Sequence, residues 1–248
     1  MDARPRFLTA EWRWLAMLNY PVEPALLAQR LPAGVELDVF DGVALVSLVG
    51  FRFLRTRVLG VSVPFHRDFD EVNLRFYVRR RVDDGWRRGV VFVRELVPRL
   101  AVAAVARLAY GEPYSAVPMA HTLEEDGRSV EYHWRWHGDW CALGVETEPT
   151  WTSSAPGSEM AFVTEHFWGY SGAPGRPTRE YAVEHPPWRV RTASRATTSG
   201  DLTRVYGAEL GAVLARPPRS AFLAEGSPIL VRRPRTLDDR DAWTTLAG

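Results

Sequence analysis

Two neighbouring charged residues, Arg94 and Glu95, lie inside an apolar segment, VVFVREL at positions 90–96. The alternating valines and the phenylalanine of this segment are typical of a buried strand. Successive side chains of a strand point to opposite faces, so the two charges project to opposite sides of the sheet. A buried charge needs a partner, and a buried carboxyl without one acquires a raised pKa and can transfer protons. Glu95 is therefore a candidate catalytic residue.

Two interpretations of these charges remain open. In the first they form ion pairs between strands, Arg94 with Glu71 and Glu95 with Arg75 or Arg99. In the second, one of them lines an internal ligand site, where a guanidinium binds a carboxylate through two parallel hydrogen bonds. Arg75, Arg94 and Arg99 are then candidate ligand-binding residues. The sequence does not indicate which of the two neighbouring charges faces inward.

The densest polar run is FHRDFDEVNLRFY at 65–77. Here His66 is a second candidate catalytic residue, since an imidazole titrates near neutral pH and Asp68 could orient it. The alternative is an exposed loop ordered by Arg–Asp pairs. The strand that follows, 70–80, has one apolar face and one polar face, and the polar face consists of Glu71, Asn73, Arg75, Tyr77 and Arg79. That polar face meets either bulk water or a wet interior.

A metal site is not expected. His133 and His137 have the spacing of a helical chelate, but the alternation around them indicates a strand, on which they lie about 13 Å apart. The single cysteine, Cys141, excludes an intramolecular disulfide and a cysteine-based metal cluster. We therefore expect no metal and no cofactor.

The elements that position these residues are mainly strands. Period-two patterns predict strands at 42–53, 70–80, 90–96, 129–137, 139–149, 179–186 and 188–194, and an Asp83-Asp84-Gly85 turn predicts a hairpin between the second and third. Helices are predicted at 23–32, 99–110, 157–167 and 203–214, the third with Ser158 as its cap. We expect one domain over 1–235 and a loosely held tail over 236–248. So many antiparallel strands favour a closed or nearly closed sheet, because closure removes exposed edges.

The charge and composition of the chain restrict the classes of partner that we expect. The 248 residues carry a formal net charge of +1, which gives no global attraction to nucleic acid or to a membrane. All 31 basic residues are arginines, and a guanidinium does not form a Schiff base. No signal peptide is recognised at the N-terminus, and no apolar stretch reaches the roughly 18 residues of a spanning helix. A cytoplasmic location is expected, and a homo-oligomer is left open.

Four segments together resemble the YqjF-like uncharacterised proteins, which are grouped with the acetoacetate decarboxylase-like superfamily. They are WLAMLNYPVEPALLAQRLPAGVELDVFDGVALVSLVGFRF, PFHRDFDEVNLRFYV, RRGVVFVRELVPR and TEHFWGY. The resemblance implies an α+β fold, mainly antiparallel, with a conical β-barrel around a ligand cavity and a few helices packed outside. It also implies that Arg13 and Ser47 lie near positions of a functional arginine and a functional glutamate of the decarboxylases.

This sequence departs from the motif on which the decarboxylase chemistry depends. In the decarboxylases, an Arg-Glu-Leu run precedes a proline and two lysines, the first of which is the Schiff-base nucleophile; here Arg99 follows Pro98. We therefore expect a small-molecule-binding protein for an anionic ligand such as a small carboxylate. The alternatives are a lysine-independent lyase or hydrolase that uses Glu or His for acid–base catalysis, and an interaction module whose barrel is filled.

Overall fold

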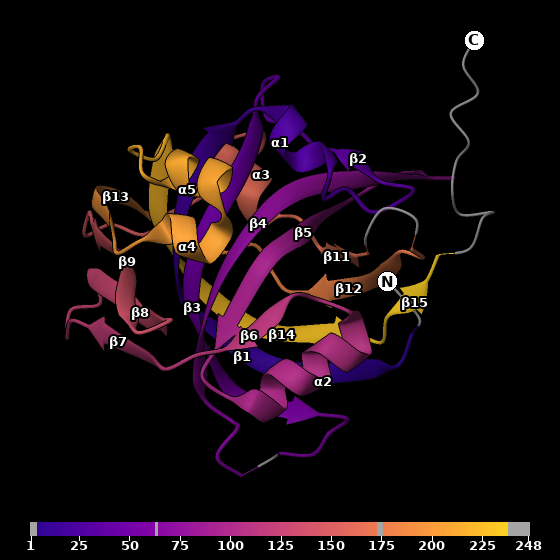
Figure 1. Ribbon diagram of the computed structural model, residues 1–248, viewed down its shortest axis with the longest axis horizontal. Helices are drawn as coiled ribbons and strands as arrows, with labels where there is room; N and C mark the ends of the chain where they lie inside the picture. Colours follow the sequence, from indigo (N-terminus) through magenta and orange to yellow (C-terminus); the bar gives the residue numbers. More distant parts are fainter. Residues whose placement is uncertain (1–3, 63, 173–175, 238–248) are drawn as a thin grey trace.

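The computed structural model describes residues 4–62, 64–172 and 176–237. Its helices are α1 Pro24–Ala28, α2 Leu100–Tyr110, α3 Glu159–Thr164, α4 Leu202–Tyr206 and α5 Ala208–Leu214 (Figure 1). Its strands are β1 Arg6–Val22, β2 Glu36–Leu37, β3 Ala44–Val58, β4 Phe69–Val82, β5 Gly85–Val97, β6 Tyr114–Ala116, β7 Met119–Leu123, β8 Ser129–Trp136, β9 Asp139–Thr147, β10 Thr152–Ser153, β11 Trp168–Ser171, β12 Arg179–Glu184, β13 Arg189–Ser199, β14 Ser220–Arg232 and β15 Arg235–Thr236.

Seven strands close into a ring in the order β1, β3, β4, β5, β11, β12, β14 and back to β1. The neighbours in this ring are antiparallel, except that β5 and β11 run parallel over two residue pairs. The predicted α+β fold, with a closed, mainly antiparallel sheet, is confirmed. None of the helices in the described ranges combines the length and the hydropathy of a membrane-spanning segment.

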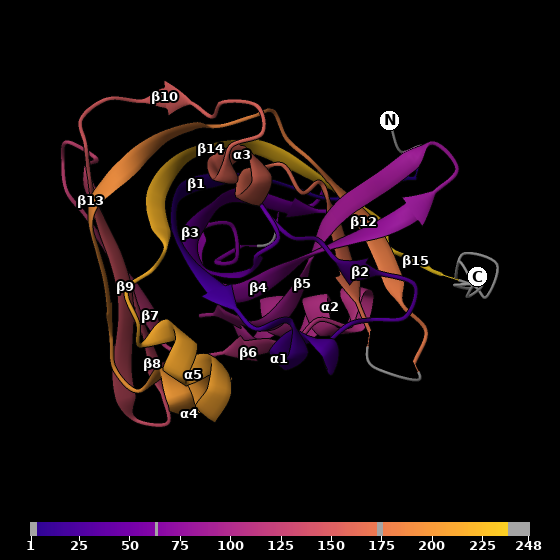
Figure 2. The ribbon, with the colours of Figure 1, turned by 90° about the horizontal axis from the view of Figure 1, so that it is seen from above.

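A second antiparallel layer stands beside the ring. β14 also pairs with β13, and β9, β8 and β7 continue from it in that order. Figure 2 shows this layer along one flank of the ring, with α4 and α5 next to it. The apolar core between the two layers takes Leu18 and Leu48 from the ring, Tyr132 and Trp134 from β8, and Leu210 from α5.

A second core lies inside the ring. It contains Met17 and Val49 from β1 and β3, Phe222 from β14, and Phe162 and Val163 from α3. Helix α3 thus covers one end of the ring, where it is seen in Figure 2. Helix α2 lies toward the other end (Figure 1). Both helices therefore help to enclose the interior.

A bulge in β1 sets which side chains enter the ring. The register of β1 on β3 shifts between Arg13 and Ala16, and Trp14 adopts a left-handed backbone with φ of 51°. An extra residue in one strand turns the following side chains to the other face. As a result Trp12 and Leu15 both face the interior, whereas Trp14 packs against the core outside the ring.

Most predicted elements are found near their predicted ranges. The strands at 42–53, 70–80, 90–96 and 129–137 correspond to β3, β4, β5 and β8, and the Asp-Asp-Gly turn joins β4 to β5. The Ser158 hydroxyl accepts a hydrogen bond from the backbone N–H of Ala161 and caps α3 as predicted.

Three predictions differ from the structure. The helix predicted over 203–214 is split into α4 and α5 at Gly207, whose φ of 89° interrupts helical geometry. No strand was predicted at 6–22 or at 220–232, which form β1 and β14. Residues 15–20 of β1 and most of β14 are buried or half-buried on both faces, so their sequences lack clean alternation. Thr236, which belongs to the predicted tail, lies in β15 and pairs with Arg179 of β12. The tail residues 238–248 lie outside the described residues.

Candidate functional site

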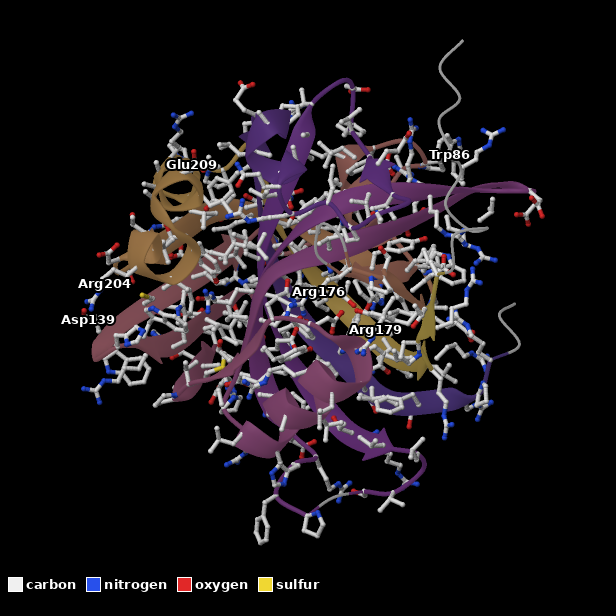
Figure 3. All side chains as sticks on the ribbon, turned by 45° about the vertical axis from the view of Figure 1, so that its right-hand side comes forward. Trp86, Asp139, Arg176, Arg179, Arg204 and Glu209 are labelled. Atoms are coloured by element: carbon white, nitrogen blue, oxygen red, sulfur yellow. The ribbon has the colours of Figure 1, made fainter. Side chains whose placement is uncertain are left out.

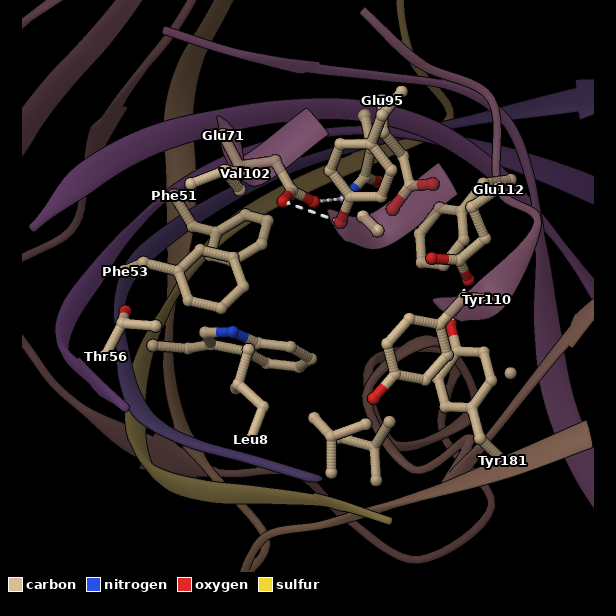
Figure 4. Close-up of a pocket in the computed structure, with 18 of the residues that line it drawn as sticks. Leu8, Phe51, Phe53, Thr56, Glu71, Glu95, Val102, Tyr110, Glu112 and Tyr181 are labelled. Atoms are coloured by element: carbon tan, nitrogen blue, oxygen red, sulfur yellow. Dashed lines mark hydrogen bonds between the residues drawn. The ribbon is translucent and has the colours of Figure 1, made fainter. Parts of the chain in front are cut away.

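A cavity of about 180 Å³ lies inside the ring. Figure 4 shows that its walls differ: apolar side chains that include Phe51 and Phe53 face carboxyl and phenol groups that include Glu95, Glu112 and Tyr181. The apolar walls come mainly from β1, β3 and α2, and the polar wall from β4, β5 and the segment that follows α2. A site of this kind binds a ligand with one polar end and one apolar end.

The alternation of β4 supplies one part of the polar wall. Glu71, Asn73 and Arg75 line the cavity, whereas Val72 and Leu74 between them point into the core outside the ring. The polar face predicted for this strand therefore meets the interior rather than bulk water.

A second bulge, in β5, brings Glu95 to the same wall. Asn73 of β4 lies opposite Glu95, but Arg75 lies opposite Phe92, so β5 has one extra residue between these pairs. Phe92 and Glu95 consequently both line the cavity, although three positions separate them. Arg94 points outward, with its guanidinium 4.7 Å from the centre of the Trp136 ring. The structure thus settles which of the two charges faces inward.

Three glutamates meet at the polar wall, each almost fully buried: Glu71, Glu95 and Glu112. Glu71 accepts hydrogen bonds from Asn73 Nδ2 at 3.0 Å and from the Tyr114 hydroxyl at 3.1 Å. Glu112 accepts one from the Tyr181 hydroxyl. Oε2 of Glu95 is buried and has no hydrogen-bond partner in the part of the chain that the structure describes.

Glycine at position 169 of β11 makes the Tyr181 contact sterically feasible. A Cβ atom at Gly169 would lie 2.1 Å from the Tyr181 ring, well inside contact distance. The Tyr181 ring therefore crosses β11 at a position that only glycine allows, and its hydroxyl reaches Glu112.

Burial makes all three carboxyl groups weaker acids than an exposed glutamate. It raises the pKa of Glu71 to about 7, against the effect of its two hydrogen bonds and of the nearby Arg75 charge. It raises the pKa of Glu112 to about 8, with a further increase from the charge of Glu71. Burial, followed by the charges of Glu112 and Glu71, raises the pKa of Glu95 well above its usual value. Well below pH 7, Glu71 and Glu112 therefore hold most of their protons, and the raised pKa of Glu95 favours its protonated form.

Arg75 is the cation of this wall. It is 9% exposed, and its Nη2 donates to the backbone carbonyl of Val163 in α3 at 3.0 Å. Its Nε is buried without a partner, and Arg75 forms no ion pair with any carboxylate among the residues described. By contrast Arg80, also on β4, lies 2.7 Å from the carboxylate of Glu180. The cavity thus contains a buried guanidinium that has an unused donor edge.

Besides His66, two further histidines, His166 and His185, line the cavity. Burial, together with the charge of Arg75, lowers the pKa of His185 to about 4, and its ring stacks on Trp188 at 4.1 Å between centroids. His166 lies 3.0 Å from Asp38, and burial lowers the pKa of His166. The imidazole of His185 is therefore neutral at physiological pH, so it does not compete with Arg75 for an anion.

The residues proposed from sequence are distributed as follows. Glu95 and Arg75 line the cavity, and His66 lines it at its outer end. Nδ1 of His66 lies 2.8 Å from the carbonyl of Pro64, whereas Asp68 accepts from the backbone N–H of Arg55. Asp68 is thus engaged by the backbone and does not orient the imidazole.

The other proposed residues lie outside the cavity lining. Arg13 contacts Glu11 at 2.8 Å, and Arg99 is exposed at the start of α2. Ser47 is buried between Asn19 and Tyr77, each 2.6 Å from its hydroxyl. Arg94, Arg13, Arg99 and Ser47 are therefore not brought together with Glu95.

Three residues of the carboxyl and phenol wall were not foreseen: Glu112, Tyr114 and Tyr181. The first two lie in GEPYSA after α2, a segment that reads as an exposed turn, and they enter the site because β6 pairs parallel with β5. In the described ranges, the cavity wall included, no group of three or more His, Cys, Asp or Glu residues is arranged to hold a metal ion.

The ring of strands around a polar and aromatic cavity has the fold of the acetoacetate decarboxylase-like proteins. Acetoacetate decarboxylase from Legionella pneumophila matches with a TM-score of 0.67 at 13% identity, over 96% of this chain and 90% of its own. The enduracididine biosynthesis enzyme MppR, complexed with the condensation product of pyruvate and imidazole 4-carboxaldehyde, matches with a TM-score of 0.68 at 14% identity, over 96% and 91%. At these identities the likeness establishes the fold.

The chain belongs to the DUF2071 family, described as "Uncharacterized conserved protein", whose model matches residues 9–228. YqjF of Bacillus subtilis (strain 168), an uncharacterized protein, is 28% identical over 207 residues, which cover 80% of this chain and 81% of YqjF. The resemblance stated from the sequence is confirmed.

Proposed function

We propose that the cavity inside the ring binds a small organic anion, with the acidic group of the ligand on Arg75. The observation that carries this proposal is the buried Arg75 guanidinium, which faces the cavity with an unpartnered Nε and no carboxylate ion pair within the described part of the chain. Protonated carboxyls do not repel an anion, so below pH 7 the cavity has a net positive charge. The guanidinium then pairs with the ligand.

The size and lining of the cavity restrict the ligand. Its volume of about 180 Å³ is slightly above that of an engineered cavity that accommodates benzene. The walls around Trp12 and Phe51 suit an apolar or planar body, and the carboxyls of Glu95 and Glu112, when protonated, supply donors to carbonyl oxygens. This supports a small carboxylic acid and speaks against an interaction module with a filled ring. MppR, which shares the fold, is described as complexed with pyruvate.

Thermal-shift measurements with pyruvate, benzoate and phenylpyruvate test the proposal. A ligand that binds the native state raises its stability by mass action, so at least one acid is expected to raise the melting temperature at about pH 6. The substitution Arg75→Gln is expected to weaken the binding of that acid at least about tenfold, the typical effect of losing a charge-assisted hydrogen bond. The wild-type effect is expected to decline at about pH 8.5, where ionised Glu71 and Glu112 repel the anion.

Arg94→Gln is the matched control, because Arg94 lies on the neighbouring strand and points away from the cavity. This variant should keep the wild-type shift. Absence of stabilisation by every acid at millimolar concentration, or an equal loss in both variants, would rule out the Arg75 site.

A second function, proton transfer to the bound ligand, is favoured by Glu95. Its Oε2 is buried, without a partner among the described residues, and burial raises its pKa well above the usual value, which favours the protonated form beside the cavity. A protonated carboxyl donates its proton to the ligand carbonyl oxygen while a water molecule takes a proton from the adjacent carbon, which forms the enol; return of both protons restores the keto form. This chemistry needs no amine, whereas the Schiff-base route requires a lysine that the chain lacks.

Exchange of the methyl protons of pyruvate in D₂O, followed by proton NMR, tests this second function. The wild-type protein is expected to accelerate exchange, and Glu95→Gln to slow it at least about a hundredfold, the usual contribution of a general acid. The variant should still show the pyruvate thermal shift. Exchange that is unchanged in Glu95→Gln would exclude proton transfer by this residue.

A further inference from the structure

Exposed apolar side chains gather at one end of the molecule. Six of the nine large apolar side chains that are exposed among the described residues lie on α2 or on the loop between β3 and β4; they are Leu59, Val61, Phe65, Leu100, Val105 and Leu108. Phe65 is 86% exposed and Leu108 is 80% exposed. Figure 1 shows the loop and α2 together at the lower end of the ring. Apolar side chains clustered in this way mark an interaction site.

This apolar cluster surrounds an opening of the cavity. Val61 of the loop and Val105 of α2 line the cavity and are also exposed, so the cavity reaches the surface between these two segments. We call the surface formed by residues 57–62, 64–67 and α2 with Arg99 the mouth surface.

The charge of the mouth surface is of one sign. The stretches 55–67 and 96–111 contain five arginines and neither Asp nor Glu. Arg55 pairs with Glu11. The other four, Arg57, Arg67, Arg99 and Arg107, are exposed and form no ion pair with any carboxylate in the described ranges. The mouth surface therefore combines protruding apolar groups with an excess of positive charge, four arginines against the one exposed carboxylate, Asp68, that adjoins it.

We propose that the mouth surface docks on an anionic lipid bilayer. Protruding Phe and Leu side chains enter the boundary between headgroups and acyl chains, and flanking arginines bind the lipid phosphates. The apolar groups project singly from a loop and from a short helix rather than forming a groove, which suits a fluid partner. This inference rests on the surface and is independent of the ligand proposed above.

A second copy of the chain fits this surface less well. A two-fold contact would bring the same patch of both copies together, so that the four arginines of one copy would meet those of the other. Like charges across a contact disfavour binding, and the two stretches offer no carboxylate to offset them. An anionic partner complements the charge, and a bilayer also accepts the apolar groups.

The proposal departs from the expectation of no membrane partner. That expectation rests on the net charge of +1 for the whole chain. Acidic residues balance the arginines elsewhere, as in the pair of Arg189 with Glu225, but not on the mouth surface. The net charge of the whole chain is therefore a poor guide to the mouth surface, which has a local excess of positive charge.

Co-sedimentation with vesicles tests the proposal. The full chain is expected to pellet with vesicles that contain phosphatidylglycerol and phosphatidylcholine, and to stay in solution with phosphatidylcholine alone. Raising the salt concentration should release it, because salt screens the arginines. Two double variants, Phe65→Ser with Leu108→Ser and Arg99→Gln with Arg107→Gln, are each expected to reduce binding to anionic vesicles at least about tenfold.

Trp86→Ser is the matched control. Trp86 is an exposed aromatic residue that Arg79 and Arg81 flank, 4.3 Å and 5.2 Å from its ring, but it lies on the β4–β5 hairpin away from the mouth surface (Figure 3). This variant should bind as the wild type does, and thermal unfolding should show that all variants remain folded.

Three results would overturn the proposal. The first is a wild type that stays in solution with anionic vesicles at low salt, and the second is equal binding by the mouth-surface variants and Trp86→Ser. The third is a dimer in light scattering that Phe65→Ser with Leu108→Ser dissociates, which would assign the surface to a second copy. A monomer that binds anionic vesicles through the mouth surface supports the proposal.

Discussion

The variant Glu112→Gln is expected to be more stable than the wild type at about pH 8 and nearly equal to it at about pH 5. The folded pKa of Glu112 is about 8, above the usual 4.5, so between these values the folded state binds more protons than the unfolded state. The free energy of unfolding of the wild type therefore falls as pH rises through this window. Glutamine resembles the protonated acid at every pH and can still accept the Tyr181 hydrogen bond.

The expected gain at about pH 8 is of order 3 kcal/mol, since each pH unit between the two pKa values contributes at most about 1.4 kcal/mol. Urea unfolding at both pH values measures it. Glu225→Gln is the control: the Arg189 hydrogen bond lowers the pKa of Glu225, so removing the charge should slightly destabilise the protein at pH 8. An equal change at both pH values in Glu112→Gln would contradict the buried carboxyl cluster.

The variant Glu180→Gln is expected to lose about 3–5 kcal/mol of stability, the usual effect of removing one partner from a buried ion pair. Glu180 is fully buried, and its carboxylate lies 2.7 Å from Arg80, 3.0 Å from Arg87 and 3.0 Å from Arg235. These arginines belong to the β4–β5 hairpin and to β15, so one carboxylate holds them to β12. A glutamine amide directs N–H donors toward guanidinium donors and leaves their charge uncompensated.

Urea unfolding at neutral pH measures this loss. Glu225→Gln again serves for comparison, because the ion pair of Glu225 with Arg189 is exposed and is worth less than about 1 kcal/mol. If the two variants had similar midpoints, the Glu180 cluster would contribute no more than a surface pair.

Local patterns in the sequence predict β4 and its polar face well, because alternation on one strand is a short-range property. They do not indicate what that face meets. Glu71 and Arg75 have the same pattern in a strand open to water as in one that lines a cavity. The resemblance to the acetoacetate decarboxylase-like proteins, rather than the alternation, predicted the enclosed interior.

The bulge in β5 limits prediction in a different way. Strict alternation would place Phe92 and Arg94 on one face and Glu95 on the other. The extra residue opposite β4 puts Phe92 and Glu95 on the same face, and nothing in VVFVREL marks it. The bulge arises from pairing with a neighbour, so it cannot be derived from one strand alone.

Glu112 and Tyr181 illustrate the longest-range limit. Their contact joins a turn after α2 to a strand that lies 69 positions further along the chain. Such contacts depend on the closure of the ring, and closure depends on β1 and β14. These strands are largely buried on both faces, so their sequences do not show the alternation of apolar and polar residues that identifies a strand. The fold class, Glu71 and Glu95 were therefore accessible from sequence, whereas Glu112 and its contact with Tyr181 were not.

The pairing of β1 with β14 has a consequence for synthesis of the protein. Arg6 lies opposite Arg232, so one long edge of β1 has no ring partner until almost the whole described chain has left the ribosome. Contacts between such distant segments form slowly, and an unpaired edge invites association with other chains. During translation the nascent chain therefore exposes its first strand for most of its elongation, which makes this edge a natural target for chaperones.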